Sequence, residues 1–427
     1  MHRTKPTHLQ RHLQQLRQQH TQTGQDTLGE VLAAPELEHI FLEETGRHRQ
    51  RLYPPLVTLR LFIDQILCGE QACQVAVSQR LAARVMQGHA QCSLSTGPYC
   101  KARKRLSLKL LQRLCKHLGA QMQSRADAQC SWKGRSIKLF DATTVSMPDT
   151  APNQQAWPQS ARQAPGLGFP VARIGALISL SSGGVIDYAI GPMQGKDSGE
   201  QTLLRQLLGS LSEHDILLAD ALHSTWWALH ALSQRGVAVV MPHDGRRKLD
   251  FTQGTIHSST DHLAWWPRPK RAAWMSKEQY AQMPQGMWVR EVQVGGRVLM
   301  TTLLDPCQAS ACEIDALYAM RWNIEVDFRT LKTDMRMEVL RCKSPAMVVT
   351  RNCGLSADLQ LGALGHGAGR SGGAQTREGY ELYERAQADL GVRGLSAPKR
   401  RAATKHPGAG VAAKHCPLSA AKATGAR

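Results

Sequence analysis

Four short stretches decide the fold: "RSIKLFD" (residues 135–141), "ARIGALISL" (172–180), "GVIDYAIGP" (184–192) and "ILLAD" (216–220). The first alternates apolar and polar residues, the second is a nearly continuous apolar run, and serines and glycines separate the second from the third. This pattern predicts a meander of three antiparallel strands. Helix-like and strand-like segments then alternate, over residues 199–211, 216–218, 225–235 and 237–240. Three strands followed by alternating helices and strands predict an α/β fold with a mixed sheet.

The residues before this core predict helices. "PLVTLRLFIDQIL" (55–67) and "LSLKLLQRLCKHLG" (106–119) carry apolar residues at helical spacing. Between them, "TGPYCKARKRL" (96–106) crowds four basic residues together, Lys101, Arg103, Lys104 and Arg105. A dense basic segment on helices suits contacts with DNA phosphates, although a solvated charged face is the alternative. We therefore expect a polar arm over residues 1–50 and a helical DNA-binding domain over 51–130.

The overall charge supports a nucleic-acid partner. The chain of 427 residues has 53 Lys and Arg against 34 Asp and Glu, a formal charge of +19. Such a balance favours a polyanion, although a basic surface without such a partner is the alternative. No stretch approaches the ~20 apolar residues that span a bilayer, and the polar start has no apolar signal core, so we expect a cytosolic protein. The 11 cysteines are scattered without zinc-site spacing, which predicts free thiols.

The second half of the chain changes character twice. Residues 243–297 hold four tryptophans among prolines and basic residues and predict an inserted, partly β subdomain. "RVLMTTLLD" (297–305) then returns to strand character, so the core comprises residues 131–242 and 298–350. Ser344-Pro345 is a good helix start. Residues 351–427 are rich in glycine and cannot continue an amphipathic helix, so we expect a disordered tail and hypothesise a frameshift after about Val349.

The stretch "DALYAMRWNIEVDFRTLKTDMRMEVLRCKSP" (315–345) is typical of a helix with an unusual polar stripe. At ~100° per residue, four polar side chains fall within a stripe about 60° wide. These are Tyr318, Arg321, Glu325 and Lys332. An adjacent apolar stripe would pack on the sheet, so the polar residues border the core. An ordinary ion pair between Arg321 and Glu325 is the alternative.

Two further acids favour a metal site. Asp141 and Asp220 each end a β-like run, where a buried carboxylate is costly unless it is paired or holds a metal. Sites in α/β sheets gather at strand ends. Together with Glu325, these aspartates supply the oxygen ligands that Mg²⁺ prefers. Two such ions can activate a nucleophile and stabilise a leaving oxygen on phosphorus.

These residues carry a resemblance to a known family. A strand Asp, a second strand Asp and a helix Glu in this order are similar to the DDE transposases of the ribonuclease H-like fold. Tyr318-x2-Arg321-x3-Glu325-x6-Lys332 resembles the Y-x(2)-R-x(3)-E-x(6)-K signature of the IS4 family of bacterial insertion sequences. "DATTVSMPDT" (141–150) and "PGLGFPVARIGALISLSSG" (165–183) also look like family segments, and the resemblance covers residues from about 50 to 350. Ala221 departs from the pattern, because the family often has Arg there.

The resemblance implies a ribonuclease H-like mixed sheet with flanking helices, with Asp141, Asp220 and Glu325 as ligands of two Mg²⁺ ions, for which Mn²⁺ can substitute. It implies that Tyr318, Arg321 and Lys332 contact DNA phosphate near the cleavage site. Family members with the insertion use it to hold a flipped base at a hairpin. Four tryptophans offer such a stacking surface here, with core packing as the alternative: Trp265, Trp266, Trp274 and Trp288.

The implied function is that of a transposase. It would cut double-stranded DNA at the terminal inverted repeats of its element and join the ends to target DNA. We expect a homodimer on DNA, at the nucleoid in the bacterial cytoplasm. A non-catalytic remnant that only binds DNA ends, or a structure-specific nuclease, is the alternative.

Overall fold

The computed structural model describes residues 35–46, 51–67, 72–90, 92–127, 131–182, 184–195, 198–321 and 339–353. The chain divides into two compact units, Met1–Leu390 and Gly391–Arg427, and every described residue belongs to the first. Three of the expectations fall outside the described residues: those for Glu325, for Lys332 and for the tail from residue 354 onward.

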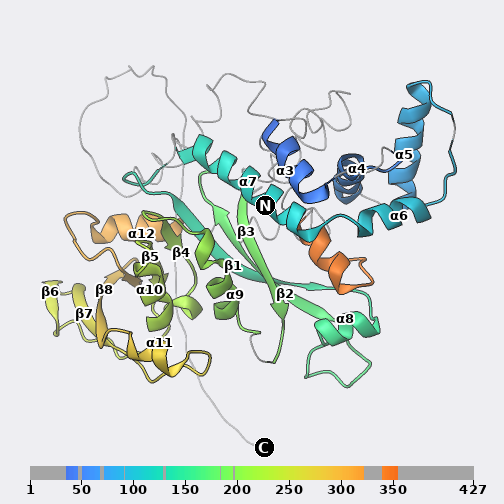
Figure 1. Ribbon diagram of the computed structural model, residues 1–427. Helices are drawn as coiled ribbons and strands as arrows, with labels where there is room; N and C mark the ends of the chain where they lie inside the picture. Colours follow the sequence, from blue (N-terminus) through green and yellow to red (C-terminus); the bar gives the residue numbers. More distant parts are fainter. Residues whose placement is uncertain are drawn as a thin grey trace, which may run out of the picture. The chain divides into compact units, whose positions relative to one another are not determined.

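A nine-stranded mixed sheet organises the first unit, in the order β3-β2-β1-β4-β5-β9-β8-β7-β6 (Figure 1). Its first five strands are β1 (Ile137–Ser146), β2 (Val171–Ser179), β3 (Val185–Pro192), β4 (Ile216–Leu218) and β5 (Ala238–Pro242). β1 pairs antiparallel with β2, and β2 pairs antiparallel with β3. β4 runs parallel to β1, and β5 runs parallel to β4. The meander and the mixed sheet expected from the sequence are therefore confirmed.

The inserted segment extends this same sheet. Its strands are β6 (Thr255–Ser258), β7 (Asp261–Pro267) and β8 (Gly286–Val294), with helix α11 (Lys277–Ala281) between the last two. β8 pairs antiparallel with β9 (Arg297–Thr301), and β9 pairs antiparallel with β5. The β character of residues 243–297 is as expected, and β9 joins the insertion's strands to those of the core.

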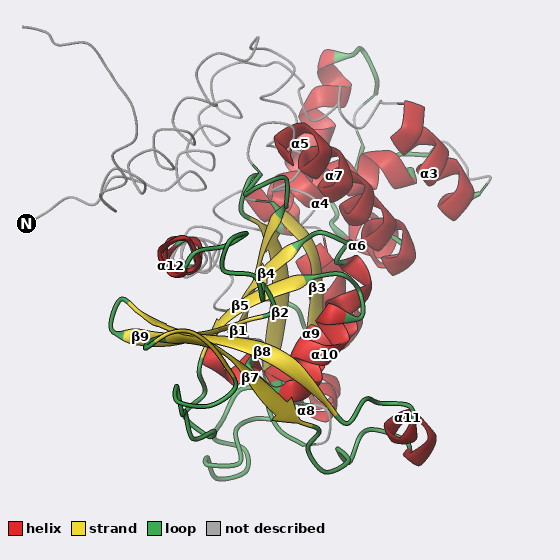
Figure 2. Cartoon of the chain, turned by 90° about the vertical axis from the view of Figure 1, so that its left-hand side faces the viewer, coloured by secondary structure: helices red, strands yellow, loops and turns green. Residues whose placement is uncertain are grey.

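Helices cover both faces of the sheet. The strands that follow the meander alternate with α9 (Glu200–Leu207), α10 (Trp226–Ser233) and the short 3₁₀ helices η1 (Leu208–Ser210) and η2 (Ala221–His223). In β4, Ile216 and Leu218 belong to one hydrophobic cluster and Leu217 to another, as in a strand buried on both faces. The first cluster includes residues of α12 (Ala311–Ala319), and the second includes residues of α9 and α10. Figure 2 shows α12 on one side of the strands and α9 and α10 on the other.

The N-terminal region is helical, as expected. Its helices are α3 (Pro35–Thr45), α4 (Pro55–Leu67), α5 (Cys73–Met86), α6 (Gly97–Lys104) and α7 (Leu108–Asp127). α3 lies within the stretch expected to be a polar arm. Leu37 of α3 and Leu114 of α7 are buried in the same cluster as β1, and Arg113 binds Glu43 and Glu44 at 2.8 and 2.7 Å. The helical region therefore begins by Pro35, where a buried apolar face outweighs the polar composition.

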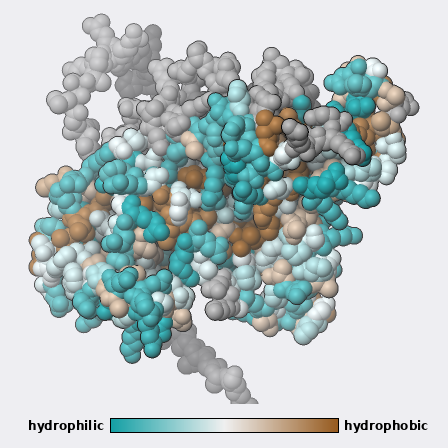
Figure 3. Space-filling view, in the orientation of Figure 1, coloured by the Kyte–Doolittle hydropathy of each residue, from teal (hydrophilic) through white to brown (hydrophobic). Residues whose placement is uncertain are grey.

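Polar residues dominate one face of the molecule (Figure 3). Figure 3 shows a mostly hydrophilic face with hydrophobic patches among the polar residues. Among the described helices, none is long and apolar enough to cross a membrane. The eight cysteines of the described residues are free, as the sequence predicts. Residues 345–353 form a helix, which confirms the helix start expected at Ser344-Pro345.

Candidate active site

Asp141 on β1 lies level with Asp220, which follows the end of the neighbouring parallel strand β4. β1 and β4 pair with Leu139 opposite Leu218, and each aspartate follows two residues later. Neighbouring strands lie ~4.8 Å apart, and side chains two residues apart along a strand point to the same face of the sheet. By this register, Asp141 and Asp220 are neighbours at the point of the sheet where β4 ends. β1 continues to Ser146, so Asp141 lies within the strand, and the expectation that it ends the strand is wrong. Only β4 stops here, because β1 is held beyond this point by β2.

A tight turn places His223 beside Asp220. Asp220 caps the 3₁₀ helix η2, and its Oδ1 accepts a hydrogen bond from the Leu222 amide at 3.0 Å. The turn returns His223 to within 3.5 Å of the same oxygen, measured from Nε2. The His223 ring is only 1% exposed and lies edge-on to Phe140, with 4.9 Å between ring centroids. Burial lowers the pKa of His223, although the Asp220 charge opposes this, so the ring favours its neutral form.

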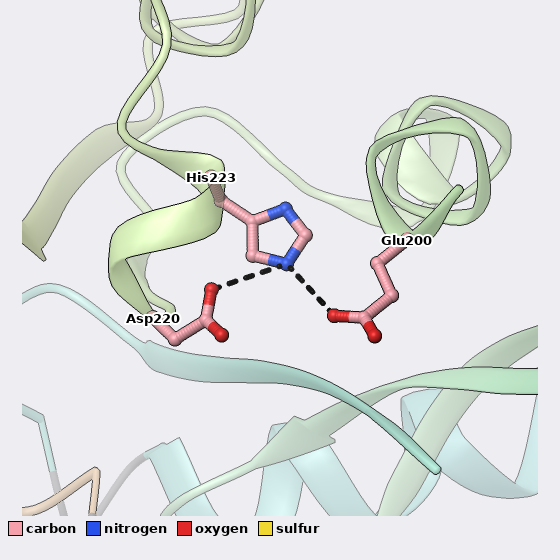
Figure 4. A group of neighbouring side chains, drawn as sticks. All are labelled: Glu200, Asp220 and His223. Atoms are coloured by element: carbon pink, nitrogen blue, oxygen red, sulfur yellow. Dashed lines mark ion pairs between the residues drawn. The ribbon is translucent and has the colours of Figure 1, made fainter. Parts of the chain in front are cut away.

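Glu200 approaches from the first turn of α9. Its Oε2 lies 4.0 Å from Nε2 of His223 (Figure 4). Its Oε1 lies 3.5 Å from Nε of Arg173 on β2. Burial raises the pKa of Glu200; Arg173 opposes this shift, and the charges of Asp220 and Asp141 add to it. Asp220 and Asp141 therefore both lie within electrostatic reach of Glu200.

Side-chain contacts fix Glu200 and η2 relative to each other. Arg173 donates from Nη1 to the Ser198 carbonyl at 3.2 Å, which holds the segment that leads into α9. Gln201 donates from Nε2 to the Leu222 carbonyl at 2.8 Å, which joins the start of α9 to η2. The acidic residues therefore stand on anchored backbone.

α12 and the turn after it carry two of the four signature residues, Tyr318 and Arg321. The helix starts with a capping box between Ser310 and Glu313. Tyr318 is buried, and the Arg321 guanidinium lies 5.6 Å from its ring centroid. Burial raises the pKa of Tyr318, opposed by the charges of Arg321 and Arg297, and the Asp220 charge also raises it. Tyr318 and Asp220 are therefore electrostatic neighbours, whereas Glu325 and Lys332 lie outside the described residues.

The basic run on α6 divides into two kinds of side chain. Lys101, Lys104 and Arg105 are exposed. Arg103 is half-buried, donates to Oε1 of Gln65 on α4 at 2.8 Å and lies 5.5 Å from the centroid of the Phe62 ring. Arg103 thus holds α6 against α4, while the other three face solvent.

The tryptophans also divide. Trp266 is buried and donates from Nε1 to Glu291 at 2.8 Å, so core packing is its role. Trp265 and Trp288 are cross-strand partners on β7 and β8, remain 48% and 43% exposed, and have ring centroids 5.2 Å apart. Trp274 is also exposed, and the Arg205 guanidinium lies 4.5 Å from its ring. The exposed pair on β7 and β8 is a surface suited to stacking.

Glu200 and His223 were not predicted from the sequence. His223 had a local signal, because it follows Asp220 by three residues, which is the spacing of a helical turn. Glu200 had none, because only the docking of α9 over the strand ends brings it to Asp220.

The donor sets differ in the metals that they fit. Asp141 and Asp220 offer carboxylate oxygens, the ligands of Mg²⁺. Glu200, Asp220 and His223 form a second set, with one ligand atom from each residue lying within 4.8 Å of the others. Both sets use Asp220, so this residue is the centre of the site.

The fold and the site together define a class of protein. The order β3-β2-β1-β4-β5, with β2 alone antiparallel to its neighbours, is the ribonuclease H-like arrangement, with Asp141 on β1 and Asp220 just after β4. Residues 132–357 match the family described as "Transposase DDE domain", which is more than half of the chain. The chain belongs to this family of DDE transposases. The resemblance to the family is thereby confirmed.

The proteins similar to this chain include a bacterial transposase and a solved transposase structure. The transposase InsG for insertion sequence element IS4, from Escherichia coli strain K12, is 24% identical over 254 residues, 58% of this chain and 56% of that protein. The chain thus spans about half the length of this relative. A solved structure of the Mos1 transposase, a paired-end complex with the left transposon end, is 16% identical and covers 55% of this chain and 78% of that one. Its TM-score of 0.17 is too low to support an argument about this chain.

Proposed function

We propose that this chain is a DNA transposase that cleaves DNA strands at the ends of its element and joins them to target DNA. The observation that carries the proposal is that Asp141 on β1 is level with Asp220, two residues after the end of the neighbouring strand β4. Two carboxylates this close repel each other unless a cation or a proton lies between them. The family of the chain supports the same reading, because its name refers to these acids.

The proposed cofactor is Mg²⁺, with Mn²⁺ as a substitute. Asp141, Asp220 and Glu325 would hold two ions, and the donor set fits because all three side chains offer hard oxygens. Bound ions of this kind activate an attacking oxygen and neutralise charge on the phosphate.

The chain's own residues bind and orient the DNA phosphate. Arg321 and Lys332 would neutralise it, and the guanidinium can donate two hydrogen bonds to one phosphate. Because burial raises the pKa of Tyr318, its hydroxyl keeps its proton at neutral pH and can donate to a phosphate oxygen. The stripe on α12 and the residues after it would therefore combine a metal ligand with a phosphate clamp.

The proposed DNA partners are the terminal inverted repeats of the element and the target. Lys101, Lys104 and Arg105 on α6 would contact the backbone of the repeats, since all three are exposed. Trp265 and Trp288 would stack on a base that leaves the helix at a hairpin. We propose a homodimer on DNA, because an element has two ends to be cut.

The test is cleavage of a labelled duplex that carries the element's ends. We expect the intact chain to need Mg²⁺ or Mn²⁺, and Asp141→Asn, Asp220→Asn and Glu325→Gln each to lower the cleavage rate at least ~100-fold. Binding of the duplex in a gel shift should survive all three changes. Glu213→Gln is the control, since Glu213 is an exposed carboxylate next to η1 and pairs only loosely with His214, 4.0 Å away. Cleavage in excess EDTA, or by the Asp220→Asn variant, would refute the proposal.

A further inference from the structure

The imidazole of His223 is buried without a hydrogen-bond partner. Its ring is 1% exposed, and neither Nδ1 nor Nε2 has a hydrogen bond to any described atom. A buried polar group without a partner destabilises the fold, because it loses the hydrogen bonds that it makes with water in the unfolded chain. If His223 only filled space beside Phe140, an apolar side chain at this position would make the fold more stable. The unpartnered Nε2 of His223 therefore points to a ligand that the folded chain does not itself supply.

Two carboxylates face the same nitrogen. Nε2 of His223 lies 3.5 Å from Oδ1 of Asp220 and 4.0 Å from Oε2 of Glu200, and all three ligand atoms lie within 4.8 Å of one another (Figure 4). Ligands on opposite sides of an ion with bonds of ~2.1 Å lie ~4.2 Å apart, so small shifts suffice to bring these three atoms around one ion.

The surroundings hold the three groups in this arrangement. Arg173 takes Oε1 of Glu200 and leaves Oε2 directed at His223. The amide of Leu222 holds Asp220, and Phe140 packs against the His223 ring. Gly175 gives the Phe140 ring its room, since a Cβ there would approach it to 3.0 Å. The geometry is therefore set by packing and hydrogen bonds on β1, β2, α9 and η2.

We propose that Glu200, Asp220 and His223 form a binding site for a divalent transition-metal ion. Two carboxylates and a neutral imidazole balance the charge of such an ion. The nitrogen ligand selects the class, because imidazole suits first-row transition metals, whereas Mg²⁺ takes oxygen ligands and gives up its waters reluctantly. The site shares Asp220 with the proposed catalytic pair, but it needs neither Asp141 nor Glu325, and it stands whether or not the chain cleaves DNA.

The site would make the chain respond to transition metals differently from Mg²⁺. Asp220 is the one carboxylate common to both donor sets, so an ion held by His223 and Glu200 fixes the position of Asp220 before DNA arrives. We expect Mn²⁺ to bind the DNA-free chain at least tenfold more tightly than Mg²⁺.

The experiment uses the full chain without DNA, stripped of metal by a chelator and free of any histidine tag. Mn²⁺ is titrated while the signal of the free ion is followed by electron paramagnetic resonance, and pulsed measurements then detect ¹⁴N coupling from a directly bound imidazole. We expect ¹⁴N coupling in the unchanged chain. His223→Gln should remove the coupling, and both His223→Gln and Glu200→Gln should weaken Mn²⁺ binding at least ~tenfold, the lower end of what even an outer-shell change costs.

Matched variants separate this site from its neighbours. Glu213→Gln removes an exposed carboxylate beside another histidine, His214, and should change neither the affinity nor the coupling. Asp141→Asn removes a ligand of the proposed catalytic pair and should keep the ¹⁴N coupling. Because Glu200 is partly exposed on a helix end, Glu200→Gln tests the site even where His223→Gln folds poorly.

Three results would overturn the proposal: an unchanged chain that binds Mn²⁺ without ¹⁴N coupling, coupling that survives His223→Gln, or Glu200→Gln with unaltered affinity. A chain that fails to cleave DNA but shows the coupling would refute the proposed catalysis and leave this site standing.

Discussion

The buried guanidinium of Arg290 fastens the inserted strands to the helix of the active site. Arg290 on β8 is fully buried and donates from Nε and Nη2 to the two oxygens of Asp261, at 2.8 and 2.5 Å. Its Nη1 donates to the Ala309 carbonyl at 2.6 Å. Ala309 precedes Ser310, which caps α12. One side chain therefore connects β7, β8 and the start of the helix that carries Tyr318.

Replacing Arg290 by methionine should destabilise the fold strongly. The Asp261 carboxylate, 8% exposed, would lose both charged hydrogen bonds, and the Ala309 carbonyl would lose a donor. Breaking a buried ion pair on one side costs ~3–5 kcal/mol. Domains have ~5–15 kcal/mol of stability in all, so this change alone would remove a large fraction.

Arg297→Met is the matched control. Arg297 on the next strand binds Asp315 at 2.6 Å, but its side chain is 38% exposed, so water replaces much of what is lost. Exposed pairs contribute ~0–1 kcal/mol, and the contact of Arg297 with the Tyr318 ring at 4.9 Å adds ~0.5–1 kcal/mol. We expect Arg297→Met to cost ~1–2 kcal/mol, clearly less than Arg290→Met.

The assay is equilibrium unfolding in urea, followed by tryptophan fluorescence. Adding Asp261→Leu to Arg290→Met should recover much of the loss, since apolar replacement of a whole buried pair is often neutral or stabilising. The reasoning fails if Arg290→Met costs less than ~1 kcal/mol, or if Arg297→Met costs as much as Arg290→Met does.

Three further predictions concern pH and DNA. Burial lowers the pKa of His230, so the unfolded chain binds more protons than the folded chain does. The urea midpoint should therefore fall as pH drops through ~6.5, the usual pKa of histidine. His230→Gln should flatten this pH dependence, and an unchanged slope would contradict the prediction. Lys101→Ala, Lys104→Ala and Arg105→Ala should each reduce the salt dependence of duplex binding by ~0.9 in log–log slope, with Lys277→Ala on α11 as control, and slopes that all stay equal would argue against a phosphate role for α6. Trp265→Ala should weaken binding of a hairpin with an unpaired base by ~1–3 kcal/mol without lowering the urea midpoint. The buried Trp266 is the contrast, since Trp266→Ala should lower the midpoint. If Trp265→Ala bound the hairpin as tightly as the unchanged chain, stacking on Trp265 would be excluded.

The core strands could be predicted because their signals are local. β1 to β3 show alternating or continuous apolar runs between turn residues, and β4 and β5 are short apolar runs between helices. The outcome for residues 243–297 was less accessible. Their β character is visible in the sequence. Their place in the sheet is not, because β8 pairs with β9 through contacts that no local sequence pattern specifies. α3 was missed because a short buried stripe, with Leu37 and Phe41, lies in an otherwise polar segment.

The candidate site shows the same division between local and long-range information. Asp220 and Asp141 could be found because a carboxylate after an apolar β-like run is conspicuous, although β1 continues beyond Asp141. Glu200 could not, because helix N-termini commonly carry acids that favour the helix dipole, and this ordinary role hides any other. Its environment distinguishes it: burial and the charges of Asp220 and Asp141 raise the pKa of Glu200, so in the metal-free chain its ionised form is unfavourable next to them. An acid that only capped α9 would be more stable in open solvent, without two like charges beside it. The arrangement makes physical sense if a cation lies between Glu200 and Asp220, and the unpartnered Nε2 of His223 indicates on which side of Asp220 that cation lies.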